Sequence, residues 1–349
     1  MNNQRIYYLD VMRVFAIFLV VLMHSPHPKA GSPGYVQAPL YFIAAAGVPL
    51  FFMISGILLL PVKKKMFTFL TYRLKKITVP LVIWSSFYVI IKYIDGELSL
   101  DILFKNILSI PFSAQGIKEM WFLYPLLGIY LLAPLLSKFI ISSEKQEILF
   151  YIILWIISLF FPLLKLLLEV DEGRTGILYY CTGYCGFFLI GYYLHHHRQN
   201  VNTLFCLILI IIPLIIYIIF RLMGWINSLS DWHFYLNICV VTNSVGWFLL
   251  IQRLFKTKLA LNMGSFPHKK NIKEILEVAS NCCFGVYLIH IFIMRHVLWK
   301  FNFIVYGFGG IGQIITTWFL TLLISFALTY LMSYLPFAGY IIGYKHKKQ

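Results

Sequence analysis

An apolar run near the amino terminus limits this chain to one class of structure. The run covers ten residues, Val14–Met23, and lies between Arg13 and His24. As a helix over 7–24 it has the length of a membrane span, and Asp10 shares a face with Arg13 three residues later. Ionisable side chains inside a bilayer are costly, so they normally face a protein interior or a water-filled cavity. The stretch therefore predicts a membrane helix whose polar face is turned toward protein or water.

Arg13 and His24 mark the two ends of that polar face. They are eleven residues apart, close to three helical turns, and are separated along the helix axis by about 16 Å. One face of the helix then carries a cation near one end and an imidazole near the other. The simpler alternative is an ion-paired arginine at the membrane interface and a histidine that caps the far end of the span.

The composition extends this interpretation to the whole chain. Hydrophobic residues make up 60% of the sequence, charged residues only 12%, and the mean hydropathy is +0.81. A soluble chain carries about twice that share of charge. We therefore predict an all-α polytopic membrane protein with a single integral domain, 1–349. The net charge of +16 indicates positive loops that meet anionic membrane lipids, and we expect no nucleic-acid partner.

Hydropathy predicts a bundle of about ten transmembrane helices. The predicted spans cover about 7–24, 40–61, 77–94, 120–138, 147–168, 176–195, 203–223, 233–252, 280–297 and 312–334. With the amino terminus inside, the inner segments carry about twice as many lysines and arginines as the outer ones. The bias predicts cytoplasmic termini and a multi-pass protein of the cell (inner or plasma) membrane.

Several loops of this predicted topology carry features of their own. The inner stretches 62–78 and 268–279 mix cations with apolar residues, which indicates helices lying at the membrane interface. The outer loops 25–39, 95–118 and 298–311 are punctuated by Pro or Gly, and we expect them to be able to form a lid.

The sequence does not indicate a metal site. The six cysteines fall inside apolar stretches and lack the spacing of zinc ligands. His195, His196 and His197 are adjacent, and successive helix positions point in different directions, so they make poor ligands together. A solvated cytoplasmic helix end explains them better, and we expect no tightly bound cofactor.

Arg13 and His24, behind Tyr8-Leu9-Asp10, resemble the first-helix signature of the acyltransferase 3 family of integral membrane acyltransferases. Further stretches resemble the family in the same order along nearly the whole chain: Pro49–Gly56, Phe69–Pro80, Trp121–Leu123, Tyr130–Leu135 and Ser280–His290. This order is more specific than any single motif. The nearest branch is the one that contains the O-acetyltransferase of enterobacterial common antigen.

The resemblance implies an enzyme that transfers an acyl group. The donor in this family is usually acetyl-CoA, and the acceptor is a hydroxyl of a cell-surface glycan or a lipid-linked sugar. Two positions depart from the pattern. Lys76 stands where the family often has a second arginine, which removes bidentate geometry, and Glu119 stands where the related branch often has His.

Acyl transfer from a thioester to a hydroxyl needs a base, and histidine titrates near neutral pH. His24 is the candidate base, and a His24 that accepts the acyl group covalently is an alternative. Arg13 is a candidate to anchor the donor or to stabilise developing negative charge, and its simpler role is to pair with Asp10. Both roles of Arg13 are compatible, and Asp10 fits a structural role better than a catalytic one.

The phosphates of CoA need cations at the inner face. Arg73 and Lys76 lie one helical turn apart, with Lys75 between them, and we predict that these three bind the donor. For the neighbouring lysines 63–65, binding of lipid phosphate is an equally good interpretation.

Five further residues are candidates for the cavity or the acceptor site. Ser55 precedes Gly56 in a span, where small residues most often permit close helix packing. Tyr287 and His290 share a face and either line the cavity or bond across helices. Glu119 and Trp121 lie at the mouth of the fourth span, where an acid can orient a base or bind sugar hydroxyls, and an aromatic can simply belong to the interface belt.

The alternative function is a multi-pass transporter of a small solute or acyl group without chemistry. Such transporters typically contain repeated halves, and no convincing repeat is present in this sequence. A purely structural membrane protein is disfavoured because intramembrane Arg and His are costly unless used. The acyl group, the acceptor and the oligomeric state stay open.

Overall fold

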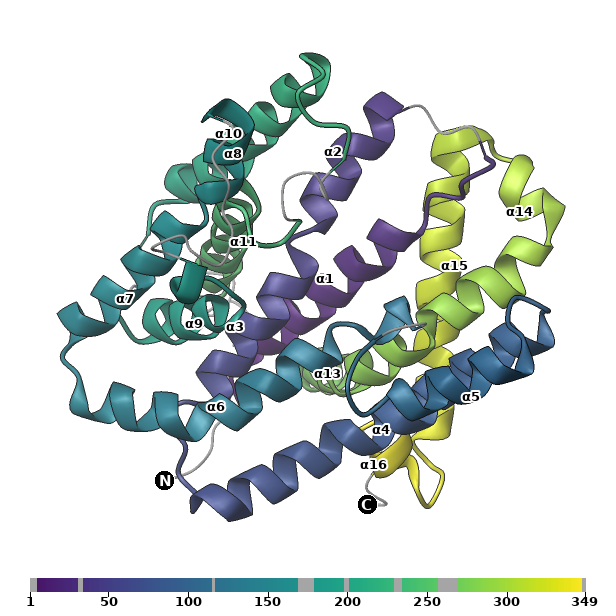
Figure 1. Ribbon diagram of the computed structural model, residues 1–349, viewed down its shortest axis with the longest axis horizontal. Coiled ribbons are helices and arrows are strands. Elements are labelled where there is room, and N and C mark those ends of the chain that lie inside the picture. The colour runs from purple at the N-terminus through teal and green to yellow at the C-terminus, as the bar shows by residue number, and fades with distance from the viewer. Residues whose placement is uncertain are drawn as a thin grey trace.

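The computed structural model describes residues 5–30, 34–114, 117–168, 179–197, 201–228, 234–256 and 269–346. Regular structure in these residues is helical throughout (Figure 1), which confirms the all-α prediction. The α-helices are α1 (Tyr7–His24), α2 (Gly34–Ala44), α3 (Gly47–Leu59), α4 (Met66–Ile94), α5 (Leu100–Ser109), α6 (Leu123–Ser142), α7 (Lys145–Ser158), α8 (Phe161–Leu168), α9 (Cys185–His197), α10 (Thr203–Leu222), α11 (Ile238–Lys256), α13 (Lys269–Phe292), α14 (Asn302–Tyr306), α15 (Gly309–Met332) and α16 (Ala338–Ile341). Single turns complete them: η1 (Lys118–Met120), η2 (Tyr179–Cys181), the π-helical η4 (Ile293–Val297) and η5 (Leu298–Lys300).

Nine helical segments of the described residues are long and apolar enough to cross a membrane. They are Tyr7–His24, Gly34–Leu59, Met66–Ile94, Lys118–Ser142, Lys145–Lys165, Thr203–Leu222, Ile238–Phe255, Asn271–Lys300 and Gly309–Met332. The protein is therefore a multi-pass membrane protein by helix composition. The tenth predicted span, 176–195, corresponds to α9, which has only 13 residues; positions 176–178 lie outside the described part of the chain.

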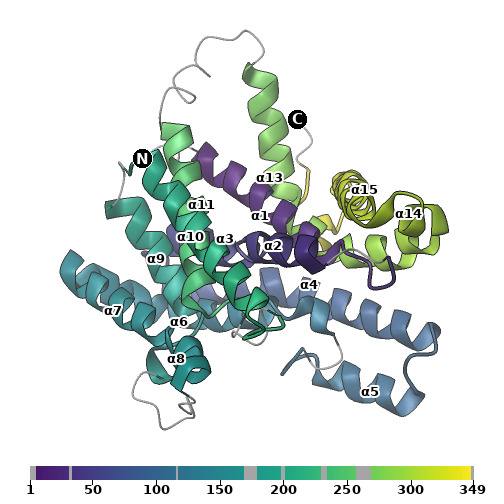
Figure 2. The same ribbon diagram turned by 90° about the horizontal axis from the view of Figure 1, so that it is seen from above.

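Helix α1 lies in the middle of the molecule, with α7–α10 to one side and α14 and α15 to the other (Figures 1 and 2). It packs against α3, α13 and α15. Small residues allow the closest of these approaches, because a side chain on Gly47 would lie 2.8 Å from the Ala16 carbonyl oxygen. On the α15 side, the Trp318 indole donates a hydrogen bond to the Phe18 carbonyl at 2.9 Å. Protein therefore surrounds α1, and its polar residues face neighbouring helices.

Helices α3 and α9 pack backbone to backbone. A side chain on Gly56 would overlap the Phe188 carbonyl, and one on Gly191 would overlap the backbone of Met53. Gly56 thus has the packing role expected of a small residue in a membrane helix. The preceding residue, Ser55, points in a different direction from Gly56 and lines a cavity described below.

Each of the two stretches predicted as interfacial helices runs directly into the predicted span that follows it. Their position at the membrane interface stays a prediction. The 62–78 stretch enters α4, a single helix of 29 residues that continues through Pro80. The 268–279 stretch enters α13, which runs without a break past Ser280. A proline inside a membrane helix is tolerated where neighbouring groups satisfy the backbone, so it did not end the helix here.

The three predicted lid segments are tied to the bundle. In the first, the backbone N–H of His27 donates to Gln313 Oε1 at 3.1 Å, and Gln313 Nε2 donates to the Ser25 carbonyl at 3.0 Å. In the second, Asp95 Oδ2 lies 3.2 Å from His296 Nδ1. The third contains η5 and α14. A lid role for these segments stays a prediction.

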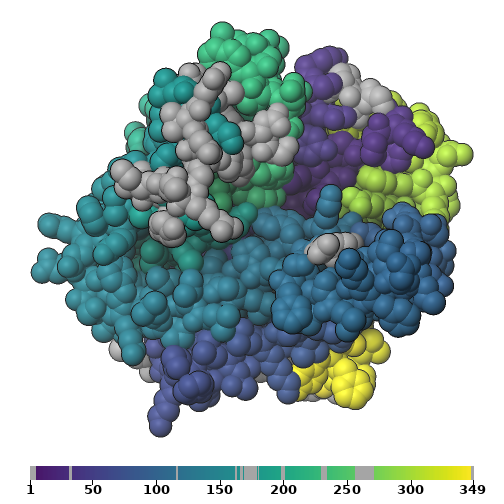
Figure 3. Space-filling model, in the orientation of Figure 1, coloured from purple at the N-terminus to yellow at the C-terminus, as the bar shows by residue number. Residues whose placement is uncertain are grey.

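Figure 3 shows the face formed by α4, α5 and α6. The residues from α16 onward emerge at the lower edge of this face, directly beside α4. The Trp84 indole of α4 donates to the Ile341 carbonyl of α16 at 2.9 Å, which holds the two elements together.

Candidate active site

A cavity of about 780 Å³ lies between α1, α3, α4, α6 and α13. Five of the predicted site residues line it: Arg13, Ser55, Arg73, Lys76 and Tyr287. They come from four helices that are far apart in the sequence. Pockets that bind small molecules and cofactors have volumes of about 300–1,000 Å³, and this cavity falls within that range. The structure therefore brings five of the eleven predicted site residues to one cavity.

The cations of this cavity differ in exposure. Arg13 and Arg73 are half-buried, whereas Lys76 is exposed. Helix α13 contributes the two carboxylates of the cavity lining, Glu274 and Glu277. The two cations of α4, Arg73 and Lys76, suit an anionic ligand on the α4 side of the cavity.

Lys75 is separated from the other two predicted donor-binding residues. It lines a neighbouring cavity of about 840 Å³ between the start of α4 and α16, and its Nζ lies 5.5 Å from the centre of the Tyr340 ring. Successive helix positions point in different directions, so one turn of helix cannot aim all three cations into the same space. Lys76 lines both cavities.

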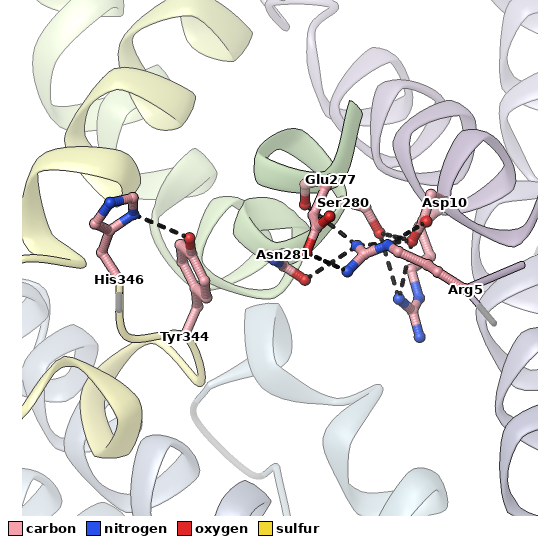
Figure 4. A network of polar contacts seen from close by, with 8 residues as sticks. Arg5, Asp10, Glu277, Ser280, Asn281, Tyr344 and His346 are labelled. Atoms are coloured by element: carbon pink, nitrogen blue, oxygen red, sulfur yellow. Dashed lines mark hydrogen bonds and ion pairs between the residues drawn. The ribbon is translucent and has the colours of Figure 1, made fainter. Parts of the chain in front are cut away.

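Asp10 is the centre of a hydrogen-bonded network at the amino-terminal end of α1 (Figure 4). Its carboxylate, only 2% exposed, accepts a hydrogen bond from Arg5 Nε at 2.7 Å and another from Ser280 Oγ at 2.6 Å. Arg13 Nη1 lies 3.5 Å from Asp10 Oδ1 and 3.3 Å from Ser280 Oγ. Arg13 therefore both pairs with Asp10, as predicted, and lines the cavity. Its contact with the donor stays a prediction.

Arg5 is a site residue that the sequence reasoning missed. Its guanidinium bridges α1 and α13, with Nη1 2.8 Å from Glu277 Oε1 and Nη2 3.4 Å from Asn281 Oδ1. In the sequence it is one cation among the lysines and arginines of the predicted inner segments. The available signal was the spacing of Glu277, Ser280 and Asn281, which places three polar side chains on one face of α13.

His24 is the last residue of α1 and lies beside His290 of α13. Their ring centres are 5.5 Å apart, and the ring centre of His290 lies 5.9 Å from that of Tyr287, which lines the cavity. His290 Nδ1 lies 2.6 Å from the Tyr287 carbonyl oxygen, and because a carbonyl only accepts, Nδ1 carries the hydrogen. His290 Nε2 is then a buried acceptor without a partner among the described residues. Three rings thus lead in sequence from the cavity to His24.

Glu119 is held between two cations next to Tyr287. Its Oε1 lies 2.9 Å from Arg295 Nη1, and its Oε2 lies 3.5 Å from Lys92 Nζ. The Tyr287 hydroxyl donates to the backbone carbonyl of Glu119 at 3.0 Å. The carboxylate therefore joins η1 to α4 and η4, and any contact with an acceptor stays a prediction. Arg295 is a second residue that the sequence reasoning did not single out.

Trp121 lies near the His24 end of α1, away from the cavity wall. Its ring stacks on Tyr235 at 5.2 Å, and the Tyr235 hydroxyl lies 3.5 Å from the sulfur of Met23. Trp121 is half-buried in this stack. The structure therefore groups it with His24 and not with the cationic residues.

Within the described residues, no three His, Cys, Asp or Glu side chains converge as metal ligands. His195, in the predicted helix end, instead shares a hydrogen bond with the Tyr8 hydroxyl of α1.

A family model described as an acyltransferase domain matches residues 6–337. No curated protein and no solved structure matches this chain. The matched range covers nearly the whole sequence, including every residue of the cavity except the last four, and the structure has the helices of a multi-pass membrane protein. The chain therefore belongs to the acyltransferase 3 family and is a membrane acyltransferase that acts on an acyl donor and an acceptor.

Proposed function

We propose that this protein is an O-acyltransferase that moves an acyl group, acetyl in the simplest case, from cytoplasmic acyl-CoA to a hydroxyl of a cell-surface glycan or a lipid-linked sugar. One observation carries the proposal. A cavity with Arg13, Arg73 and Lys76 on its walls is followed by the rings of Tyr287, His290 and His24. This arrangement supports binding of a polyanionic donor in the cavity and a base for the acceptor beyond Tyr287 and His290. The resemblance to the branch of the enterobacterial common antigen O-acetyltransferase supports acetyl as the group and an envelope glycan as the acceptor.

The cationic end of the cavity suits the nucleotide end of CoA. Arg73 offers a planar guanidinium that can bind a phosphate through two hydrogen bonds, and exposed Lys76 offers a point charge beside it. Apolar side chains further in, Phe51, Phe122 and Leu126, suit the flexible pantetheine arm. The excess of Lys and Arg in segments on the Arg73 side supports a cytoplasmic entrance for the donor.

The reaction takes place where the thioester meets the acceptor. His24 accepts the hydroxyl proton as the acceptor oxygen bonds to the thioester carbonyl carbon. The carbon–sulfur bond then breaks, and the proton passes to the CoA sulfur, so the products are the ester and free CoA. His24 is half-buried, whereas His290, which lies between His24 and Tyr287 of the cavity wall, is buried. The partial exposure of His24 favours it as the ring that the acceptor reaches.

Arg13 fits the donor better than the reacting carbon. It lies eleven residues before His24 on α1, about 16 Å along the axis of a straight helix. Charge that develops on the thioester oxygen next to His24 is too far away for direct contact. Arg13 therefore anchors the donor while it remains paired with Asp10.

Donor binding is tested first, with no knowledge of the acceptor. In native mass spectrometry, the purified protein is expected to retain bound acetyl-CoA and free CoA. Succinyl-CoA is included to show whether the size of the acyl group affects binding. A protein that retains none of them contradicts the proposal.

The chemistry is tested in liposomes that contain the purified protein, radiolabelled acetyl-CoA and a lipid-linked oligosaccharide extract. Transfer of label is expected for the wild type and is expected to be lost in His24→Ala, with donor binding unchanged. His27→Ala is the matched control, because His27 lies just beyond α1 and its ring packs against Trp299, whereas that of His24 packs against His290. Solute uptake that survives His24→Ala, without any acetyl transfer, would support the transporter instead.

A further inference from the structure

The segment Gly343–His346, which we name the strap, closes one side of the candidate donor cavity. It follows α16, and all four of its residues line the cavity together with Arg73 and Lys76. Figure 4 shows Tyr344 and His346 on the strap, with Tyr344 between His346 and the polar side chains of α13. The strap is therefore part of the cavity wall, and no motif in the sequence had suggested this.

The strap is held in place at both ends. Before it, the Ile341 carbonyl accepts a hydrogen bond from Trp84 of α4. At its end, the His346 N–H donates to the Ser333 carbonyl at 2.9 Å, beyond the end of α15. Within it, the Tyr344 hydroxyl lies 3.3 Å from His346 Nδ1. These contacts give the strap a defined path along the cavity.

Gly343 makes that path possible. Its φ of +70° lies in the left-handed region, and a Cβ there would come within 2.6 Å of the Phe284 ring on α13. The turn brings Tyr344 against α13, where burial raises the pKa of its hydroxyl and a hydrogen bond from the Asn281 side chain opposes that rise. The strap thus spans the opening from α16 to α13.

The strap adds a cation where the cavity opens. Lys345 is exposed, like Lys76, whereas Arg13 and Arg73 are half-buried. Among the described residues that line the cavity, the carboxylates are those of Glu274 and Glu277, and Arg5 already neutralises Glu277. Cations therefore outnumber free carboxylates at the opening. A phosphate there is favoured both by attraction and by charge-assisted hydrogen bonds.

We propose that the strap completes the donor site and that Lys345 binds the 3′-phosphate of CoA, so that the enzyme selects CoA over donors without that phosphate. The inference rests on the proposed function. The thioester must reach His24, so the nucleotide end of CoA occupies the open end of the cavity. The 3′-phosphate is the phosphate farthest from the thioester, and the exposed cations Lys345 and Lys76 lie where it emerges.

The test compares two ligands that differ only in this phosphate. Dissociation constants for CoA and 3′-dephospho-CoA are measured on the full-length protein in nanodiscs of zwitterionic lipid. The wild type is expected to bind CoA about tenfold more tightly, as one charge-assisted hydrogen bond predicts. Lys345→Ala is expected to remove that preference and to leave 3′-dephospho-CoA binding unchanged. Lys145→Ala removes an exposed lysine from the start of α7, outside this cavity, and is expected to keep the preference.

Other outcomes overturn the inference in distinguishable ways. If Lys345→Ala weakens the binding of CoA and of 3′-dephospho-CoA equally, or weakens the binding of neither, the strap does not bind the 3′-phosphate. If the variant keeps the CoA preference but loses co-purified anionic lipid in native mass spectrometry, Lys345 binds lipid phosphate. A wild type that binds neither CoA nor 3′-dephospho-CoA overturns both the proposed function and the inference about the strap. A wild type that binds the two ligands equally overturns only the inference about the strap.

Discussion

The two ends of α1 hold their polar side chains in opposite ways. At the amino-terminal end, the Asp10 carboxylate has three partners, Arg5, Arg13 and Ser280. At the other end, His24 touches His290 ring to ring, and the buried His290 Nε2 has no partner among the described residues. Both ends lie on the same helix and both pack against α13.

This difference indicates a structural role for the Asp10 end of α1 and a chemical role for the His24 end. A buried carboxylate with several partners is fixed by the fold, and each partner limits its freedom to exchange protons. An unpaired buried acceptor costs about 1–3 kcal/mol, so it is expected where a site keeps a group available for substrate. The Asp10 end therefore holds Arg13 at the cavity, and the His24 end keeps the rings to which we assign the proposed proton transfer.

The largest expected effect is at the His24 end. His24→Gln keeps the size and hydrogen-bonding capacity of the side chain but removes the base, and the rate of acetyl transfer is expected to fall about 10²–10⁴-fold. The affinity for acetyl-CoA is expected to stay the same, because the proposed donor contacts Arg73 and Lys76 line the cavity and His24 does not. An equal loss of donor affinity would show that the two ends are not separate in function.

The next effect is at the Asp10 end and concerns stability. Asp10→Asn leaves Arg5 and Arg13 without their shared counter-charge. Breaking a buried pair costs about 3–5 kcal/mol, and because both arginine side chains are 29% exposed we expect about 2–3 kcal/mol. Thermal unfolding of the purified protein measures the loss. The double variant Arg5→Gln/Asp10→Asn should recover part of it, and no recovery would contradict the network.

The donor cations give the third effect. Arg73→Ala is expected to raise the dissociation constant for acetyl-CoA about tenfold, because a charge-assisted contact to phosphate is lost. Lys75→Ala removes a cation that lines the neighbouring cavity, so it is expected to raise this dissociation constant less than Arg73→Ala does. The measurement is the affinity of both variants for labelled acetyl-CoA. A larger loss of affinity in Lys75→Ala would show that the donor binds in the neighbouring cavity instead.

The smallest effect is expected at Trp121. Trp121→Phe keeps an aromatic ring against Tyr235, so folding and donor affinity should be unchanged. If Trp121 contributes to the acceptor site next to His24, the KM for the acceptor should rise about threefold, in keeping with the loss of one weak contact. A change in donor affinity with no change in acceptor KM would place Trp121 with the cationic end instead.

Local patterns in the sequence anticipated the parts of the site that lie on one helix. Arg13 and His24 are on one helix, as their spacing predicted, and Arg73 and Lys76 line one cavity because they are one turn apart. Arg5 and Lys345 were missed as site residues, since each reaches the site from a short segment outside the long helices. The amphipathic stretches 62–78 and 268–279 continue into the next span because no local residue stops either helix.

The sequence by itself determined that this is a helical membrane protein of the acyltransferase 3 family, because hydropathy and motif order are properties of the chain read in one dimension. Only the tertiary structure decided which side chains share a cavity. It separated Lys75 from Lys76, joined Arg5 to Glu277, and placed the strap across the opening. The physical reason is that helix packing and the turn at Gly343 set these distances, and neither leaves a periodic signal in the sequence.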